Sequence, residues 1–159
     1  MLLLHSGTQG QSPRRELCGS GRTSLFAASQ PRSLAAAAKL ARDGDHIEVQ
    51  SGDYLGDVAN WTQNHLCLTA IGGRVRLLAQ AAHMRGKGIF VVNGEGVEIS
   101  GFDFVDARVP DGIGANIRFE TGSVVVRDCS FTRCEMGLLS NNDALPAELR
   151  PSLQYQHPR

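Results

Sequence analysis

The stretch Val97-Glu-Ile-Ser-Gly-Phe-Asp-Phe104 decides the fold, because it returns later in the chain as Val124-Val-Val-Arg-Asp-Cys-Ser-Phe131. The offset is 124 − 97 = 27 residues, and it also aligns Ile99 with Val126 and Phe102 with Cys129. Apolar residues alternate within each copy, which is the period of a strand rather than of a helix. Self-similarity at a period of roughly 20–50 residues is typical of solenoids. The sequence therefore predicts an all-β repeat protein.

Weaker repeats extend the pattern. Leu66-Cys-Leu-Thr-Ala-Ile71 is interpreted as an earlier copy of the same strand, with Ile71 in the place of Phe102. A second strand column is predicted at 88–92, 116–120 and 138–141, and its expected alignments are Ile89 with Ile117, Val91 with Phe119, and Leu138 with Ile117. These repeats are too short for a helical crossover. Successive copies are therefore expected to stack as parallel strands about 4.8 Å apart.

One helix is predicted, over residues 34–42. Ser33 is a suitable N-cap, and Gly44 suits the left-handed position that follows a last turn. Leu34, the pair Ala37/Ala38, and Ala41 share one apolar face. Because the end of a solenoid exposes apolar residues, we interpret this helix as a cap on the first coil.

The domain boundaries follow from where the pattern begins and fails. Residues 1–30 lack apolar periodicity and are expected to be disordered or loosely attached. Residues 31–143 are predicted to form the β-helix domain, with four or five coils. Pro146 and Pro151 fall where the next ladder needs N–H groups, so an irregular tail is expected over 144–159. The last coil would then be open, which suggests a truncated chain and end-to-end self-association.

Composition restricts the partners. The 159 residues carry 16 Lys+Arg and 16 Asp+Glu, so the zero net charge gives no bulk attraction to nucleic acid or anionic membrane. No apolar run approaches the roughly 18 residues of a membrane span. The apolar start is shorter than the roughly 7–15 residues of an export signal, and the compartment is left open. Cys67 lies between Leu66 and Leu68 in the sequence, Cys129 is expected to be a small core residue, and a Cys129–Cys134 disulfide is possible but not favoured.

Several stretches together resemble a known family: Gly44-Asp-His-Ile-Glu-Val49, Gly52-Asp-Tyr54, the two strands quoted first, and Glu135-Met-Gly-Leu-Leu139. They resemble the bacterial right-handed parallel β-helix proteins of the pectin-lyase-like superfamily. The resemblance implies a short right-handed parallel β-helix, and it implies contact with polysaccharides. The chain lacks the Asn-Thr-Asp, Asp-Asp and Gly-His-Gly series of polygalacturonases and the acidic calcium site of pectate lyases. We therefore expect a non-catalytic polysaccharide-contacting or structural solenoid. The alternative is a lyase, C5-epimerase or glycoside hydrolase that acts on uronate polymers.

The first candidate site joins the charged residues of one loop to those of the next strand: Asp106, Arg108, Asp111, Arg118 and Glu120. If Ile117 and Phe119 point inward, then Arg118 and Glu120 point outward, with Phe90 and Asn141 among their expected outward neighbours. Apolar and charged groups side by side suit a sugar. Two acids about 5–10 Å apart suit a glycosidase, and the catalytic candidates are Asp106, Asp111, Arg118 and Glu120. The competing interpretation is a surface ion pair with ordinary turn acids.

The second candidate site is a cluster of aromatic and polar residues in the first coil: Asp53, Tyr54, Asp57, Trp61 and Asn64. Tyr54 and Trp61 are candidates for stacking on a sugar, and the competing interpretation is that they cover the edge of the first coil. The five histidines show no metal-ligand spacing. No metal site and no cofactor are therefore predicted.

Overall fold

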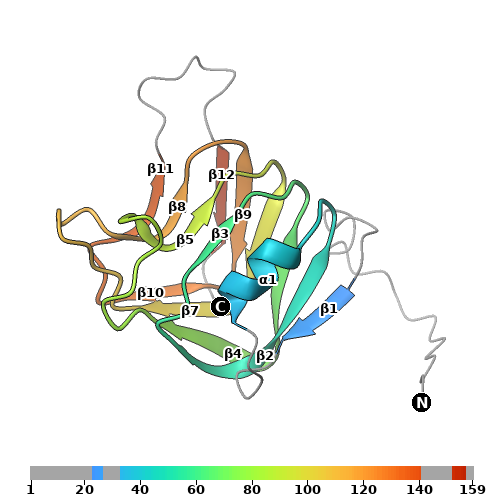
Figure 1. Ribbon diagram of the computed structural model, residues 1–159, viewed down its shortest axis with the longest axis horizontal. Helices are drawn as coiled ribbons and strands as arrows, with labels where there is room; N and C mark the ends of the chain where they lie inside the picture. The colour runs from blue at the N-terminus through green and yellow to red at the C-terminus, as the bar shows by residue number, and fades with distance from the viewer. Residues whose placement is uncertain (1–22, 27–32, 141–151, 157–159) are drawn as a thin grey trace.

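The computed structural model describes residues 23–26, 33–140 and 152–156. Its strands form parallel sheets wound into a β-solenoid of about three turns (Figure 1). The predicted all-β solenoid with a short helix near the N-terminus is confirmed. The expectation of four or five coils was wrong, because the described strands complete about three.

Two sheets make up the solenoid. The first has the strand order β1 (Thr23–Phe26), β2 (His46–Leu55), β4 (Cys67–Leu78), β6 (Val97–Ser100), β9 (Ser123–Arg127) and β12 (Ser152–Gln156). The second half of β4 also pairs with β7 (Phe102–Val105), which pairs with β10 (Ser130–Thr132). The second sheet has the order β3 (Ala59–Trp61), β5 (Gly88–Val92), β8 (Ala115–Phe119) and β11 (Met136–Ser140).

The pairing in the first sheet confirms the repeat that the sequence shows. Val97 pairs with Val124, Ile99 with Val126, and Phe104 with Phe131, all in parallel strands. The bend between β6 and β7 needs Gly101, whose φ is 85° and whose added Cβ would lie 2.8 Å from the Ala70 Cβ. Each coil can therefore cover the apolar side of the coil before it.

The earlier copy of this strand differs from expectation. Leu68 pairs with Ile99 as expected, but Val75, not Ile71, pairs with Phe102. The reason is that Gly72 and Gly73, with φ of 73° and 136°, lengthen β4 between its two halves. Gly52–Leu55 belongs to strand β2, with a register shift between Gln50 and Gly52.

The expected alignment of the second sheet was wrong by one residue between β5 and β8. Phe90 pairs with Ile117 and Val92 with Phe119, whereas Leu138 pairs with Ile117 as predicted. Phe90 is fully buried and makes edge-to-face contacts with Trp61, Phe102 and Phe104, at ring-centroid distances of 5.6, 6.1 and 5.4 Å. These aromatic contacts stabilise Phe90 in the core, so it is not on the outer face.

Helix α1 (Leu34–Leu40) packs on β3 and caps the first coil. The Ser33 hydroxyl accepts the Ala36 N–H at 3.1 Å, which confirms the predicted N-cap, and the Asp57 carboxylate accepts the Leu34 N–H at 2.7 Å. Leu34, Ala37 and Ala38 are buried. The helix ends at Leu40, and its C-cap is Ala41, so Gly44 lies in the following turn rather than at the left-handed cap position.

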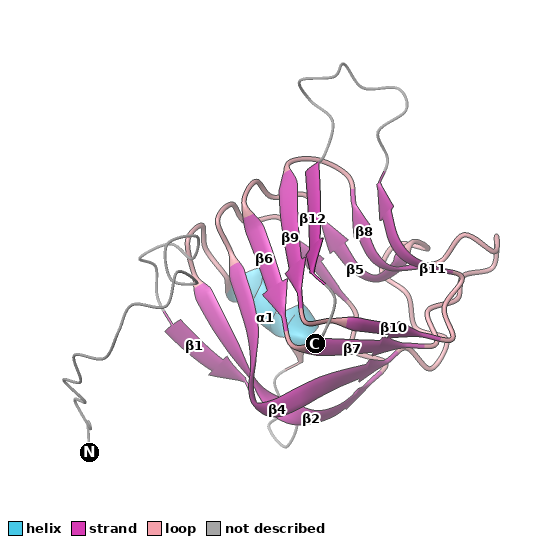
Figure 2. Cartoon of the chain, turned by 180° about the vertical axis from the view of Figure 1, so that it is seen from behind, coloured by secondary structure: helices cyan, strands magenta, loops and turns pink. Residues whose placement is uncertain are grey.

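Two strands lie where irregular segments were expected. β1 pairs with β2, and β12 pairs with β9, both in parallel. The expectation of an irregular tail was therefore wrong for Ser152–Gln156, and that of a loosely attached segment was wrong for Thr23–Phe26. Pro146 and Pro151 lie outside the described residues. Figure 2 shows β12 beside β9 at the end of the first sheet.

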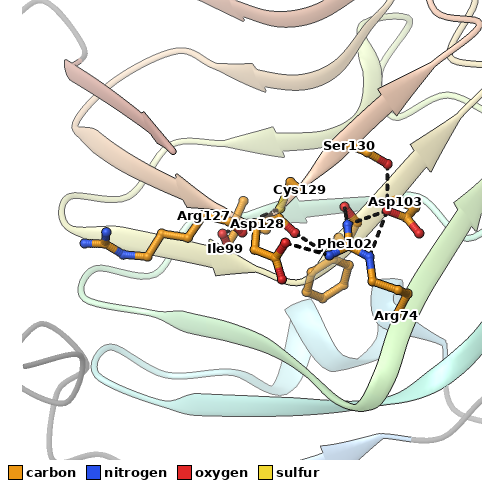
Figure 3. Close-up of polar contacts among 8 residues, drawn as sticks. All are labelled: Arg74, Ile99, Phe102, Asp103, Arg127, Asp128, Cys129 and Ser130. Atoms are coloured by element: carbon orange, nitrogen blue, oxygen red, sulfur yellow. Dashed lines mark hydrogen bonds and ion pairs between the residues drawn. The ribbon is translucent and has the colours of Figure 1, made fainter. Parts of the chain in front are cut away.

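A polar network fastens successive coils where the first sheet bends. The Arg74 guanidinium pairs with Asp103 and lies 3.0 Å from an Asp128 carboxylate oxygen. Its NH1 group also donates to the Asp128 carbonyl at 2.8 Å, and the Ser130 hydroxyl donates to Asp103 at 2.6 Å (Figure 3). These side chains come from β4, β7 and β10 or from turns beside them, so the network links three coils.

Candidate functional site

Two loops leave neighbouring strand ends and enclose a pocket. Residues 79–87 follow β4, and residues 106–114 follow β7. Because Leu78 pairs with Val105, both loops begin at the same edge of the first sheet. The pocket has a volume of about 370 Å³, and its lining is Ala81, His83, Asp106, Arg108, Val109 and Pro110. We call it the loop pocket.

Asp106 is the carboxylate of the loop pocket, and Arg133 holds it. Arg133 Nε donates to Oδ1 at 2.8 Å, and NH2 donates to Oδ2 at 3.0 Å. Both residues adopt left-handed backbone, with φ of 60° for Asp106 and 51° for Arg133. A two-point pair of this kind fixes the orientation of the carboxylate.

The pair also sets the charge of Asp106. The hydrogen bonds from Arg133 lower the pKa of the Asp106 carboxyl, desolvation opposes them, and the positive charges of Arg133 and Arg108 add to the lowering. The same contacts raise the pKa of Arg133. Asp106 is therefore an ionised hydrogen-bond acceptor at neutral pH.

His83 contributes a donor to the loop pocket. Its Nδ1 accepts the Gly86 N–H at 3.0 Å. In the neutral ring, the proton must then reside on Nε2, which is a donor. No metal-ligand spacing surrounds this histidine in the sequence, and its place in the lining of the loop pocket depends on the conformation of the 79–87 loop.

Glu135 fixes the 106–114 loop. Its Oε2 accepts the Gly114 N–H at 2.5 Å and the Val109 N–H at 3.3 Å. Arg108 and Pro110 are exposed, whereas Val109 is buried. The loop therefore places the solvated guanidinium of Arg108 beside the apolar residues Val109 and Pro110. Glu135, from the next coil, holds the backbone of this loop.

The structure separates the members of the first predicted site. Asp106 and Arg108 line the loop pocket, but Asp111 accepts the Ile113 N–H at 3.2 Å in an exposed turn and is not part of the lining. Arg118 alternates with the core residues Ile117 and Phe119 and so lies on the outer side of β8, as expected.

Glu120 pairs with Lys87. Asn141, its expected neighbour, lies outside the described residues. Burial lowers the pKa of Lys87, and the positive charges of Arg118 and Arg85 add to this lowering. The outer neighbours of Arg118 are Val91 and Leu139 in the adjacent strands, not Phe90. Val91 is fully buried, whereas Arg118, Glu120 and Leu139 are half-buried, so charged and apolar side chains are mixed on the outer side of the second sheet.

The second predicted site has structural contacts throughout. Trp61 is fully buried against Phe90, and the buried Tyr54 donates its hydroxyl to the Gln50 carbonyl at 2.9 Å. Its polar members bind other parts of the chain: Asp53 pairs with Arg76, Asp57 caps α1, and Asn64 bonds to Asp43. The aromatic rings are therefore not available to stack on a sugar.

Sequence reasoning missed Arg133, His83, Val109 and Pro110. A signal for Arg133 was present, since 133 − 106 = 27 is the offset of the main repeat and places Arg133 directly after Asp106 in the stack. No periodic signal identifies the other three, because they belong to loops.

Among residues 33–140 and the two short described strands, no group of three or more His, Cys, Asp or Glu is placed to hold a metal ion. No helix within the described residues is long and apolar enough to cross a membrane. Comparison with protein-family models, with curated proteins and with solved structures gave no match.

Proposed function

We propose that this chain is a relative of the pectin-lyase-like β-helix proteins that binds acidic polysaccharide at the loop pocket without cleaving it. The relationship is supported by the parallel register of the strands over Val97–Phe104 and Val124–Phe131, which are the stretches that resemble the family. The observation that carries the binding proposal is the composition of the pocket: a free guanidinium, an imidazole donor, an oriented carboxylate and an apolar wall.

These groups match the parts of a uronate residue. Arg108 is placed to pair with the sugar carboxylate, while Asp106 accepts sugar hydroxyls. The exposed Pro110 offers apolar surface to the face of the ring. Arg133 already neutralises Asp106, so Arg108 is the cation among the described lining side chains that would meet an acidic ligand. A volume of about 370 Å³ lies within the usual range of roughly 300–1,000 Å³ for small-molecule sites.

The same geometry favours binding over cleavage. A glycosidase needs a pair of carboxyl groups, one of them protonated. Asp106 is the single carboxyl group among the described residues that line the pocket, and its lowered pKa keeps it ionised at neutral pH. A purely structural solenoid and a uronate-specific lyase, epimerase or hydrolase are the alternatives to be tested.

The test is calorimetric titration with oligogalacturonate and with a neutral galactose oligomer of the same length. We expect the acidic oligomer to bind, and Arg108→Gln to weaken binding about tenfold, as loss of a charged hydrogen bond of about 1.4 kcal/mol implies. Arg42→Gln, an exposed arginine after α1, is the control and should bind normally. Absence of binding at millimolar oligomer would support the structural alternative. Unsaturated products or new reducing ends would support an enzyme.

A further inference from the structure

Three pairs in the chain place an aspartate or asparagine directly before a glycine: Asp43-Gly44, Asn93-Gly94 and Asp111-Gly112. In such a pair the backbone nitrogen of the glycine can attack the side-chain carbonyl carbon of the residue before it, because glycine places no side chain in the way. Both groups must first leave their contacts in the fold. The contacts of each pair therefore decide whether it reacts in the folded protein.

Asp111-Gly112 lies in the exposed part of the 106–114 loop. Its hydrogen bonds stay within one turn: the Gly112 N–H donates to the Val109 carbonyl at 3.0 Å, and the Ile113 N–H donates to the Asp111 carboxylate at 3.2 Å. Among the described residues, no heavy atom beyond its chain neighbours lies within 4 Å of a Cβ built on Gly112. Opening of this turn disturbs no other coil, and local openings of that kind cost little free energy.

Asp43-Gly44 is fastened to the next coil through Asn64. The Asp43 carboxylate accepts the backbone N–H of Asn64 at 2.9 Å and its side-chain amide at 3.2 Å. The Gly44 N–H, on the nitrogen that would attack, donates to the Asn64 carbonyl at 2.8 Å. Both reacting groups are therefore held by a residue from another coil.

Asn93-Gly94 is packed between two other coils. The Asn93 side-chain amide donates to Asn60 at 3.1 Å, and the Asn93 carbonyl accepts the Thr121 hydroxyl at 2.7 Å. Gly94 is buried, and a Cβ on it would collide with the Gln63 carbonyl oxygen. Movement of this pair therefore requires stacked coils to separate, which costs more free energy than the opening of one turn.

We infer that Asp111 is a modification site, at which the folded protein converts aspartate to isoaspartate while Asp43 and Asn93 stay unchanged. The Gly112 nitrogen bonds to Asp111 Cγ and gives up its proton, the protonated carboxyl gives up its hydroxyl, and one water leaves as a succinimide ring forms. Water then opens the ring at the main-chain carbonyl of Asp111, which yields isoaspartate with no net change in mass. The main chain now passes through Cβ and Cγ, beside Pro110 of the loop pocket. This inference is independent of the proposed function.

Long incubation of the natural sequence in warm, slightly acidic buffer tests the choice of site. An isoaspartate-specific methyltransferase labels the product with a methyl group from S-adenosylmethionine, and mass spectrometry of the peptides locates the label. We expect at least about ten times more isoaspartate at Asp111 than at Asp43 or Asn93, the factor that corresponds to an opening easier by about 1.4 kcal/mol. In urea Asn93 should instead react first, because an unhindered asparagine cyclises faster than an aspartate. Absence of isoaspartate at Asp111, or equal amounts at all three sites of the folded protein, would overturn the inference.

Asp111→Asn gives the matched comparison with Asn93, because both positions then carry the same side chain before a glycine. In the folded variant, position 111 should release its amide as ammonia at least about ten times faster than Asn93 does, which the rise in peptide mass measures. Equal rates at the two positions would show that the fold does not select the site. Asp111→Ser cannot form the ring and is the negative control, so methylation at position 111 should disappear.

Discussion

Asp106 and Arg133 occupy the same position in successive coils, and their side chains form an ion pair with Nε–Oδ1 and NH2–Oδ2 distances of 2.8 and 3.0 Å. Each follows directly on a strand, β7 or β10, and each adopts left-handed backbone. Stacking of the coils therefore places a cation from one coil against an anion from the next. The orientation of the carboxylate in the loop pocket is thus a property of the repeat.

The first prediction concerns Arg133→Gln, which removes this pair. We expect the pKa of Asp106 to rise toward the ordinary aspartate value of about 3.9, which carboxyl-detected NMR titration measures. In the folded protein the pKa of Asp106 is lower than in the unfolded chain. The pair therefore stabilises the fold fully at pH values above the unfolded-state pKa of Asp106. This contribution is lost as the pH falls through the folded-state pKa. The Tm difference between the two proteins should therefore be larger at pH 7 than at pH 2.

A Tm difference that persists unchanged at pH 2 would mean that Arg133 acts through packing rather than charge. Arg108→Gln is the matched control. Arg108 contributes only through its charge, without a hydrogen bond to Asp106, and should move the pKa of Asp106 less.

The second prediction concerns the network around Arg74. Burial raises the pKa of the Asp103 carboxyl, but hydrogen bonds from Arg74 and Ser130 and the charges of Arg74 and Arg76 outweigh it, so the pKa is lowered overall. We expect Asp103→Asn to destabilise the fold by about 1 kcal/mol at neutral pH, a modest value because Arg74 is 36% exposed and solvent screens the pair. Urea unfolding measures the change.

The loss from Asp103→Asn should shrink in acid, because protonation of Asp103 removes the same interaction from the natural sequence. Asp111→Asn is the control, since Asp111 makes one hydrogen bond in an exposed turn. A loss equal to that of the control would show that the network does not fasten the coils.

The third prediction concerns the aromatic core. Phe90→Ala is expected to destabilise the protein by about 3–5 kcal/mol, because a fully buried ring with three aromatic neighbours leaves a cavity. Leu40→Ala, at 68% exposure, should change stability by no more than about 0.5 kcal/mol. Urea unfolding of both variants provides the comparison. A small loss of stability for Phe90→Ala would mean that Phe90 lies on the outer face, as the sequence predicted.

Phe90 also shows where sequence reasoning reached its limit. The offset of 27 residues predicted the Val97–Val124 and Phe104–Phe131 pairs correctly, because alternating apolar residues specify one register. Residues 88–92 are apolar apart from glycine, so nothing distinguishes an inward Ile89 from an inward Phe90. A slip of one residue reverses every side chain in a strand, and the expected outer face was wrong for that reason.

The pocket and the terminal strands were predictable only in part. Leu153 and Tyr155 alternate with glutamines, and this alternation is the sequence signal of strand β12. Pro146 and Pro151, which precede it, had suggested an irregular tail. The repeat offset relates Asp106 to Arg133, and it was available in the sequence. The presence of His83 and Asp106 in one pocket lining depends on two loop conformations, and no sequence period encodes these.

The fourth prediction concerns thiol reactivity. Burial raises the pKa of the Cys129 thiol to about 11, which leaves about one thiolate in a thousand at pH 8. Cys134 is half-exposed. Brief treatment of the folded protein with iodoacetamide should therefore label Cys134 and spare Cys129, as mass spectrometry of the peptides will show. Equal labelling of both would indicate that the coil around Cys129 opens readily.

The last prediction concerns self-association at the C-terminal end of the solenoid. Among the described residues, β11 and β12 are the last strands of their sheets, and β10 pairs only with β7. Phe131 and Leu138 are only partly buried there, and Met136 is 38% exposed. Open strand edges with apolar residues favour pairing with another chain.

Because α1 packs on β3, the first strand of the second sheet, the C-terminal edge of that sheet in another molecule cannot pair with β3, and contact between two C-terminal ends closes as a dimer. We expect sedimentation velocity to show a concentration-dependent dimer, and Met136→Lys to raise its dissociation constant about tenfold by placing like charges across the contact. Leu40→Lys, on exposed α1, should leave the dimer unchanged. A natural sequence that stays monomeric at about 0.5 mM, well above the micromolar dissociation constants of weak specific dimers, would disprove this contact. Loss of the dimer in Leu40→Lys would place the contact at the capped end.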